Sequence, residues 1–424
     1  MPTHNTKWYS SSMTGAPALS GEAGKLTDIL NACLVDGFNQ VTLTSLVVAS
    51  DVATATYTAH GFQQYQIVVI AGATPSSLNG SWRVASVAAN TFTFATSGIT
   101  DQTATGTITC KTESAGWEKA FTGTNTVVYR STSTNASGNH AVRVTDTGTT
   151  TATCLAAEDW TDVSTPVNTI DTFYVPKSST ANSTARNWYV VADDRTVYIL
   201  TAWNGGRYDA LTWGEIASFL SGDGHAFHYR APRAAGVASL GYQTSLGFTV
   251  TAQTYTTTYG HLARPYTQTV GATTSALASM AGSTYETGID FATSAIQYGD
   301  TGSTQKVFKL SAAYGWSVSS GTIGYSSYRF TGPSPVDGGI HFVPVYIVEQ
   351  PLTPTQKIRG TARGLLHILE WLPLTSDIAI LPNVDGVTGG LVLGFKTQNE
   401  ISGYAAAQRL YAETHIAISL GDWA

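Results

Sequence analysis

Apolar residues recur with helical spacing near the start of the chain. The apolar face of this segment consists of Leu26, Ile29, Leu30, Cys33 and Leu34. Intervals of three and four residues place side chains on one face of a helix. Ser20 can cap the first turn, Glu22 suits the positive helix N-terminus, and Asp36-Gly37 ends the pattern. We therefore predict an amphipathic helix over about residues 20–36, with its apolar face in a core.

Between residues 41 and 112 the pattern changes to short alternating segments separated by turn signals. In the run Thr91-Phe92-Thr93-Phe94 both phenylalanines point to one face and both threonines to the other, which is the period of a strand. Asn79-Gly80 tolerates positive φ, as a tight hairpin requires. Because Gly116-Trp117-Glu118 begins a different pattern, we predict that residues 41–112 form a small β-barrel module inserted into the chain.

Residues 113–230 contain further strand-like segments, at Thr126–Arg130, Ala141–Val144, Trp188–Val191 and Val197–Leu200. We expect them in one antiparallel sheet, with the last two joined as a hairpin through Asp193-Asp194-Arg195. Thr212 and Glu215 have the capping-box spacing of a helix start, which predicts a short helix ending at Gly222. Residues 1–40 and 113–230 are together predicted to form an N-terminal β-rich domain.

After residue 230 the chain is rich in Thr, Tyr and Gly and contains strand-like runs at 340–348 and 391–395. Residues 231–424 are therefore predicted to form a C-terminal β-rich domain. The expected fold class is mainly β, with several antiparallel β-sandwich or barrel modules, an N-terminal amphipathic helix and one or two short helices. No repeat of fixed period occurs, which argues against a propeller or a solenoid.

Charged residues are scarce in this chain. Its 424 residues include 22 Lys and Arg and 28 Asp and Glu, 12% in all, and the net charge is −6. A nucleic-acid surface needs concentrated Lys and Arg, so we expect no nucleic-acid partner. No apolar stretch approaches about 18 residues, so we expect no membrane insertion. The N-terminus lacks the apolar core of a signal peptide, which indicates synthesis in a cytoplasm.

Side chains that could carry chemistry are scattered along the sequence. Cys33, Cys110 and Cys154 include no CxxC pair, which argues against a disulfide scaffold or a zinc site. His225 and His228 would face opposite sides of a strand, so we interpret them as a wet strand edge and not as metal ligands.

Motifs for catalysis are missing from the sequence. It has neither the G-x-S-x-G motif of a hydrolase nor a glycine motif that binds phosphate. Asp193-Asp194 lies between two predicted strands and is interpreted as a turn. A glycosidase pair stays open for the acids Asp223, Asp290, Asp337 and Glu349, because folding alone can bring two carboxylates together. We predict no catalytic, cofactor-binding or metal-binding residues and no enzymatic activity.

Five segments carry a resemblance to a known family: Trp8–Pro17, Leu30–Phe38, Val127–Arg130, Val142–Val144 and Asp193–Tyr198. In these segments the sequence resembles a group of virion-associated proteins from tailed bacteriophages and prophages. Segments between residues 59 and 94 resemble a small β-module of many phage tail and capsid-associated proteins. Residues 359–394 resemble a divergent end of the same family. Residues 235–330 match no motif, which leaves open a receptor-facing addition or a structural filler.

The resemblance implies a structural component of the virion, in the tail or tail tip. Such a protein assembles with copies of itself and with other virion proteins in the host bacterium's cytoplasm. Two alternatives stay open. The 10 Trp and 21 Tyr residues suit a host-surface glycan or receptor site, with exposed aromatic rings in residues 231–424. A polysaccharide depolymerase would require two carboxylates in one cleft.

Overall fold

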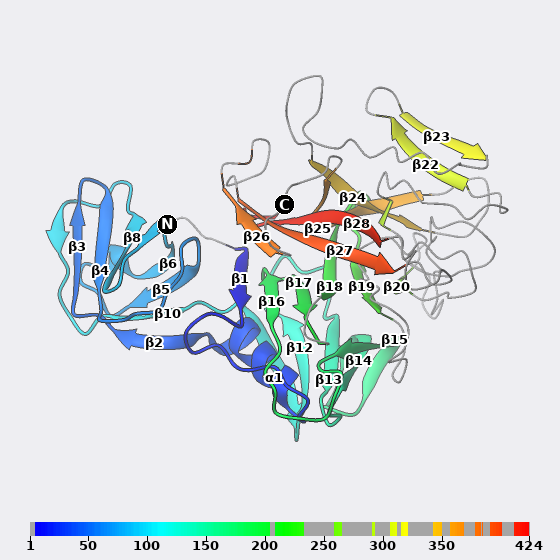
Figure 1. Cartoon of the computed structure of the whole chain (residues 1–424), viewed down its shortest axis with the longest axis horizontal. Helices are drawn as coiled ribbons and strands as arrows, with labels where there is room; N and C mark the ends of the chain where they lie inside the picture. The colour runs from blue at the N-terminus through cyan, green and yellow to red at the C-terminus, as the bar shows by residue number, and fades with distance from the viewer. Residues whose placement is uncertain are drawn as a thin grey trace.

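The computed structural model describes residues 5–203, 208–232, 258–264, 291–292, 306–311, 315–320, 342–349, 357–368, 378–382, 384, 391–400 and 411–423. The described chain is mainly β, as predicted. Its strands form five sheets, and its helical segments are residues 25–36 and a short turn at 76–78. A β-module projects on the left of Figure 1, and a larger body lies on the right.

The N-terminal helix buries the predicted apolar face but begins later than expected. It consists of α1 (Lys25–Leu30), which continues without a break into the π-helical turn η1 (Asn31–Asp36). Ser20 does not cap the helix, because its hydroxyl donates to the Glu22 carboxylate over 2.7 Å. Gly37 ends the helix with a φ of 71°, a conformation that favours glycine.

The cap of α1 comes from a residue far along the chain. One carboxylate oxygen of Asp146, Oδ2, accepts hydrogen bonds from the backbone N–H groups of Leu26 (2.7 Å) and Thr27 (3.2 Å). A helix start leaves such donors without partners inside the helix. Lys177 Nζ donates to the other oxygen of Asp146, and both side chains are fully buried. Tertiary structure therefore supplies the cap that the sequence suggested at Ser20.

Residues 38–112 fold as a module with its own core. One sheet has the order β2 (Phe38–Thr42), β10 (Thr109–Thr112), β5 (Ile67–Ala71) and β6 (Gly80–Arg83). The other has the order β7 (Ser86–Val87), β8 (Thr91–Ala95), β4 (Val52–Thr56), β3 (Ser45–Ala49) and β9 (Gln102–Thr103). Inward-facing side chains of both sheets form one cluster, separate from the core of the body. The chain enters on β2 and leaves on β10, and these strands pair with each other.

The Asn79-Gly80 segment does not form the expected tight hairpin. Residues 72–79 connect β5 to β6 and include the 3-10 turn η2 (Ser76–Leu78). Asn79 has a φ of −78°, and its side-chain amide closes the loop through bonds of 2.8 and 2.9 Å to the backbone of Ala73. The asparagine is a turn residue, but it acts through its side chain and not through positive φ.

The body has two large sheets where the sequence predicted one. The first is a meander of β11 (Trp117–Gly123), β12 (Thr126–Ser131), β13 (Ala141–Thr145), β14 (Thr151–Trp160) and β15 (Pro166–Pro176). The predicted hairpin of β16 (Trp188–Ala192) and β17 (Thr196–Thr201) is present, but it belongs to the second sheet. There β16 pairs with β1 (Lys7–Ser10), a partner that local pattern cannot identify.

The second sheet continues across the predicted domain boundary at residue 230. After β17 it runs through β18 (Asp209–Ser218), β25 (Lys357–Ile368), β28 (Tyr411–Ser419), β27 (Val392–Glu400) and β26 (Ile378–Leu381). β18 and β25 are joined by pairs such as Ile216 with Ala362, so the boundary does not coincide with a break in the sheet. Branches of this sheet are β19 (Phe227–Pro232), β20 (Thr258–Leu262), β21 (Phe291–Ala292) and β24 (Phe342–Glu349). β22 (Lys306–Ser311) and β23 (Gly315–Ser320) form a separate hairpin.

The helix predicted at 212–222 is wrong, because this segment lies mostly in strand β18. The hydroxyl of Thr212 donates to the carbonyl of Val197 on β17 over 2.8 Å instead of capping a helix. Trp213 is fully buried, and Gly214 adopts a φ of 129°, which no helix contains. Spacing alone cannot distinguish a capping box from a strand whose Thr and Glu bond to residues elsewhere in the chain.

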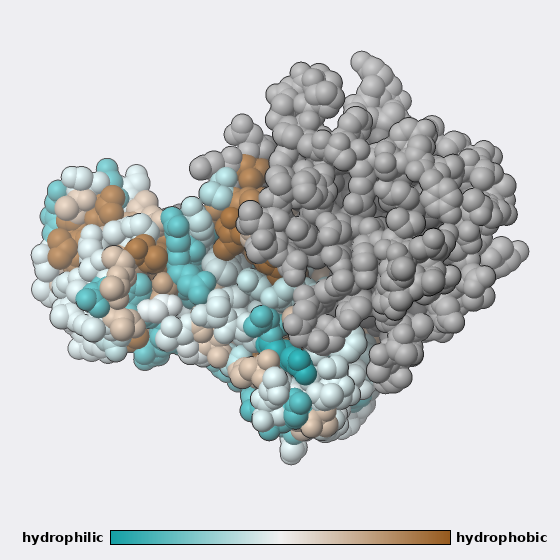
Figure 2. All heavy atoms as spheres, in the orientation of Figure 1, coloured by the Kyte–Doolittle hydropathy of each residue, from teal (hydrophilic) through white to brown (hydrophobic). Residues whose placement is uncertain are grey.

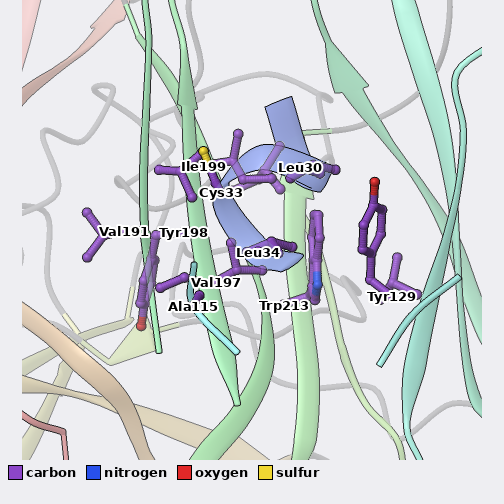
Figure 3. Packing of buried hydrophobic residues seen from close by; sticks show 14 of the residues in the cluster. Leu30, Cys33, Leu34, Ala115, Tyr129, Val191, Val197, Tyr198, Ile199 and Trp213 are labelled. Carbon is purple, nitrogen blue, oxygen red and sulfur yellow. The ribbon is translucent and has the colours of Figure 1, made fainter. Parts of the chain in front are cut away.

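The main core joins the helix to both sheets of the body. Figure 3 shows Leu30, Cys33 and Leu34 of the helix packed among residues of β17 and β18. Tyr129 belongs to β12 of the meander, and its hydroxyl donates to Asn31 Oδ1 of the helix over 3.0 Å. The helix therefore packs between the five-stranded meander and the larger sheet, which also contact each other directly where Phe173 of β15 stacks on Tyr229 of β19.

Candidate interaction surface

The sheet β7-β8-β4-β3-β9 of the module has an outer face without charge. Inward-facing residues of this sheet, such as Phe92 and Phe94, are fully buried. The opposite side presents a set that we call the neutral face: Ser45, Val47, Ala49, Val52, Thr54, Thr56, Ser86, Thr91, Thr93, Ala95 and Thr103. The alternation of Thr with apolar residues that predicted strands here therefore also determines the chemistry of the exposed side.

Strand register arranges the neutral face in rows. One row crosses all five strands through Thr103, Val47, Thr54, Thr93 and Ser86. Val47 is 37% exposed and Val52, in the next row, is 42% exposed, whereas most large apolar residues of the described chain are buried. Figure 2 shows apolar atoms, in brown, on the projecting module on the left.

None of the charged residues of the module belongs to the neutral face. Residues 41–112 contain only the charged residues Asp51, Arg83, Asp101 and Lys111. The two aspartates accept backbone hydrogen bonds within loops at the module's turns. Arg83 and Lys111 instead reach the body, where they donate to the carbonyls of Leu420 (2.8 Å) and Asp36 (2.7 Å). The two basic residues thus connect the module to the body, and the two aspartates stabilise its loops. The neutral face contains none of these charges.

This arrangement suits contact with another surface and not acid–base chemistry. A face of methyl groups and hydroxyls can be buried without the large cost of removing charges from water. Its hydroxyls still donate and accept hydrogen bonds, so they can fix the register of a partner. No residue of the neutral face titrates near neutral pH, which leaves it without a general acid or base.

The two histidines that invited a metal interpretation lie in different environments. His228 is fully buried in β19, with Nδ1 3.0 Å from the Gly214 carbonyl oxygen, so the predicted wet strand edge is wrong for this residue. His225 lies in the preceding loop, half-buried, with Nδ1 3.0 Å from Nε2 of His140. Within the described residues, no group of three or more His, Cys, Asp or Glu could hold a metal ion.

The acidic candidates are bound to other groups where the structure describes them. Asp193-Asp194 forms the turn between β16 and β17, as predicted, and Asp193 is also buried against Arg363. Burial raises the pKa of Asp223, but hydrogen bonds from Arg359 and Ser218 outweigh it and hold that pKa below its usual value. Asp290 and Asp337 lie outside the described residues, as does the side chain of Glu349 in β24.

Aromatic residues of the described chain mostly form cores. Seven tryptophans are buried: Trp8, Trp82, Trp117, Trp160, Trp188, Trp213 and Trp423. The aromatic glycan site expected in residues 231–424 depends largely on side chains outside the described residues. Where the structure describes the chain, it contains no helix that combines the length and apolar character needed to span a bilayer.

Comparisons with known proteins add little to this description. The sequence matches no family model and no curated protein. Among solved structures, the chain is similar to the phage phi92 endosialidase, with 11% identical residues and a TM-score of 0.16. That alignment covers 90% of this chain and 52% of the endosialidase, so the chain spans about half the length of that protein. A similarity this weak supports no conclusion about fold or activity.

Proposed function

We propose that this protein is a structural component of a tailed bacteriophage virion, in the tail or tail tip, that acts by assembly. The proposal rests first on the resemblance of Trp8–Pro17 and Leu30–Phe38 to virion-associated proteins. These two segments contribute β1 and the last turn of the helix, which lie in the main core. The resembling residues thus belong to the part of the chain that organises the body.

The observation that carries the proposal is the neutral face on a projecting module. Obligate protein interfaces bury about 2,000 Å² or more and are more apolar than ordinary surface. A charged partner would lose hydration against the neutral face and gain no counter-charge. A second copy of this chain presents a surface of the same neutral character, so we assign the face to contact between copies, with other virion proteins as further neighbours.

The proposal includes no catalytic step. In the described chain, Glu158 and Asp223 each accept two hydrogen bonds from one arginine, Arg264 and Arg359 respectively. Such pairing keeps a carboxylate ionised and occupied, whereas a glycosidase acid needs a carboxyl group that holds its proton near neutral pH. A role in binding surfaces requires neither.

The experiment is the oligomeric state of the full chain, measured by sedimentation velocity over a range of concentrations. Val47→Lys places a charge in the neutral face, and Val167→Lys is the matched control, since Val167 is a valine of β15 with 39% exposure. We expect an oligomer that Val47→Lys weakens at least tenfold in dissociation constant, about 1.4 kcal/mol, and that the control leaves intact.

Two results would overturn the proposal. One is a wild-type chain that stays monomeric at every concentration and is also missing from mass spectra of purified particles. The other is equal weakening by both lysine variants, which would show that net charge and not the neutral face controls assembly. A chain that is found in particles but is monomeric alone would restrict the neutral face to contacts with other virion proteins.

A further inference from the structure

Two histidines from distant parts of the chain meet where the meander contacts the larger sheet. His140 precedes β13 in the loop of residues 132–140, and His225 precedes β19 in the loop of residues 219–226. Their rings are nearly perpendicular, at 88°, and Nε2 of His140 lies 3.0 Å from Nδ1 of His225. Phe227 stacks on the His140 ring, with centroids 5.2 Å apart. The pair therefore packs against Phe227 of β19.

The same two loops are also joined through Ser137. Its backbone N–H donates to the carboxylate of Glu215 on β18, and its hydroxyl accepts a hydrogen bond of 3.2 Å from the N–H of Ala226. The bonds of Ser137 to Glu215 and Ala226 and the contact between the two histidines thus hold the loop of residues 132–140 to the β18–β19 hairpin. Among these contacts, only the histidine pair can take up a proton near neutral pH.

Hydrogen bonding determines which nitrogen of His140 holds the proton. Nδ1 of His140 is buried and has no hydrogen-bond partner in the structure. A buried N–H without an acceptor is rarer and costlier than a bare ring nitrogen in the same place. The proton of neutral His140 therefore belongs on Nε2, which donates to Nδ1 of His225. Nδ1 of His225 must then be unprotonated.

The charged groups that face the pair are already matched with one another. Glu158 on β14 lies 3.8 Å from His225 Nδ1, but it is held by two hydrogen bonds from Arg264, of 2.6 and 2.7 Å. Asp223, beside His225, is held in the same way by Arg359 of β25, at 2.7 and 2.8 Å. Each carboxylate that the structure describes near the two rings is therefore paired with a guanidinium group, so the charge of a protonated ring has no unpaired carboxylate beside it.

We propose that the His140–His225 pair is a proton-sensitive contact, which holds the loop of residues 132–140 to the β18–β19 hairpin at neutral pH and releases it in acid. Protonation of His225 at Nδ1 would place two N–H donors against each other. Moving the proton of His140 to Nδ1 would relieve this only by leaving a buried N–H group without an acceptor. Protonated His225 would turn toward Glu158, away from His140.

The direction of the pH effect follows from the shifted pKa values. Burial, and after it the charge of the neighbouring His225, lowers the pKa of His140 from 6.5 to about 3. Burial and then Arg264 lower the pKa of His225. At pH values between the unfolded-state and folded-state pKa values, the unfolded chain therefore binds protons that the folded chain does not bind. The contribution of the pair is complete above pH 6.5 and is lost as the pH falls toward the folded-state value.

The first test is the protonation state of the two rings in the wild-type chain, from ¹⁵N chemical shifts of the histidine side chains. We expect two neutral rings at neutral pH, with the proton of His140 on Nε2. A His140 ring that is charged at neutral pH, or that holds its proton on Nδ1, overturns the proposal. This measurement needs no variant, so it decides the question even if a substitution prevents folding.

The second test compares unfolding equilibria at several pH values. His140→Gln keeps a side-chain N–H for Nδ1 of His225 but cannot titrate. His60→Gln is the control, because His60 lies in the module and its ring nitrogens form hydrogen bonds only with backbone atoms there. In the wild type, one proton raises the unfolding constant by up to about tenfold per pH unit of acidification. We expect His140→Gln to flatten this slope and His60→Gln to keep it. Equal slopes for wild type and His140→Gln overturn the proposal.

Discussion

Arg363 donates a hydrogen bond to the carboxylate of Asp193, which lies 170 residues earlier in the chain, and both side chains are almost completely buried. The other oxygen of Asp193 accepts from the backbone N–H groups of Arg195 (2.9 Å) and Thr196 (2.7 Å). One carboxylate therefore shapes the β16–β17 turn and connects it to β25. The pair links the N-terminal strands of the larger sheet to strands that follow residue 356.

We predict that Asp193→Asn destabilises the protein by about 3–5 kcal/mol, because it leaves the Arg363 guanidinium buried without a counter-charge. The measurement is the free energy of unfolding in urea. Asp28→Asn is the control, since Asp28 forms an exposed pair with Lys25 at 3.6 Å and should change stability by less than about 1 kcal/mol. Similar small changes for both variants would contradict a structural role for the buried pair.

A second prediction concerns the distant cap of the helix. Lys177 Nζ donates to the carboxylate of Asp146. It also donates to the carbonyls of Glu22 and Gly148, over 2.7 Å in both cases. Asp146→Ala removes the cap and also leaves this ammonium without its carboxylate, so we expect a loss of about 3–5 kcal/mol. Lys177→Met should also destabilise the protein, because it leaves the Asp146 carboxylate unpaired.

The two variants differ in their effect on the helix start. Asp146→Ala removes the acceptor for the N–H group of Leu26, whereas Lys177→Met keeps it. Amide hydrogen exchange at Leu26 should therefore accelerate much more in Asp146→Ala than in Lys177→Met at matched global stability. Equal exchange in both variants would mean that Asp146 acts only as the counter-ion of Lys177.

What the sequence could predict was local. The helical spacing from Leu26 to Leu34 identified the buried face correctly, because periodicity is a property of neighbouring residues. The start of the helix could not be found, since its cap lies 120 residues away in sequence from Leu26. The alternation in β3, β4 and β8 predicted strands, and the same alternation contained the neutral face. Its lack of charge was visible as composition, but its projection from the body was not.

Misassigned elements share one physical cause, namely side chains whose partners are remote in sequence. Thr212 and Glu215 have the spacing of a capping box, yet Thr212 bonds to Val197 on the neighbouring strand and Glu215 bonds to Ser137 in a distant loop. The histidine pair joins residues 85 positions apart, so no local motif marks it. Residues that act through such contacts become visible only when strand pairing is known.

The cysteines supply a third prediction. Cys33, Cys110 and Cys154 are free and buried, and burial raises the pKa of each thiol. A thiol reagent requires both access and a thiolate, so we expect no labelling of the folded protein at pH 8 and labelling of all three thiols after unfolding. The measurement is the mass of the labelled protein. Rapid labelling of Cys110 alone would show that the module opens without the body.

The final prediction is that the module folds by itself and can be removed. β2 and β10 pair through Thr42 and Thr109, so the chain enters and leaves the module on neighbouring strands. Without the module, the end of the helix loses only the bond from Lys111 to the Asp36 carbonyl, because the carbonyls of Cys33 and Leu34 accept from residues 115 and 116, which follow the module. Replacing residues 38–112 by a short Gly-Ser linker should therefore leave a body that unfolds cooperatively.

Residues 38–112 expressed alone should bury Trp82, the single tryptophan of this segment. Its indole N–H donates to the Leu78 carbonyl over 2.9 Å, and its ring lies 4.8 Å from that of Phe94. We expect blue-shifted tryptophan fluorescence that moves to longer wavelength in one transition with urea. If contact between copies depends on the neutral face, the body without the module should sediment as a monomer, and an oligomer formed by that body would place the contact elsewhere.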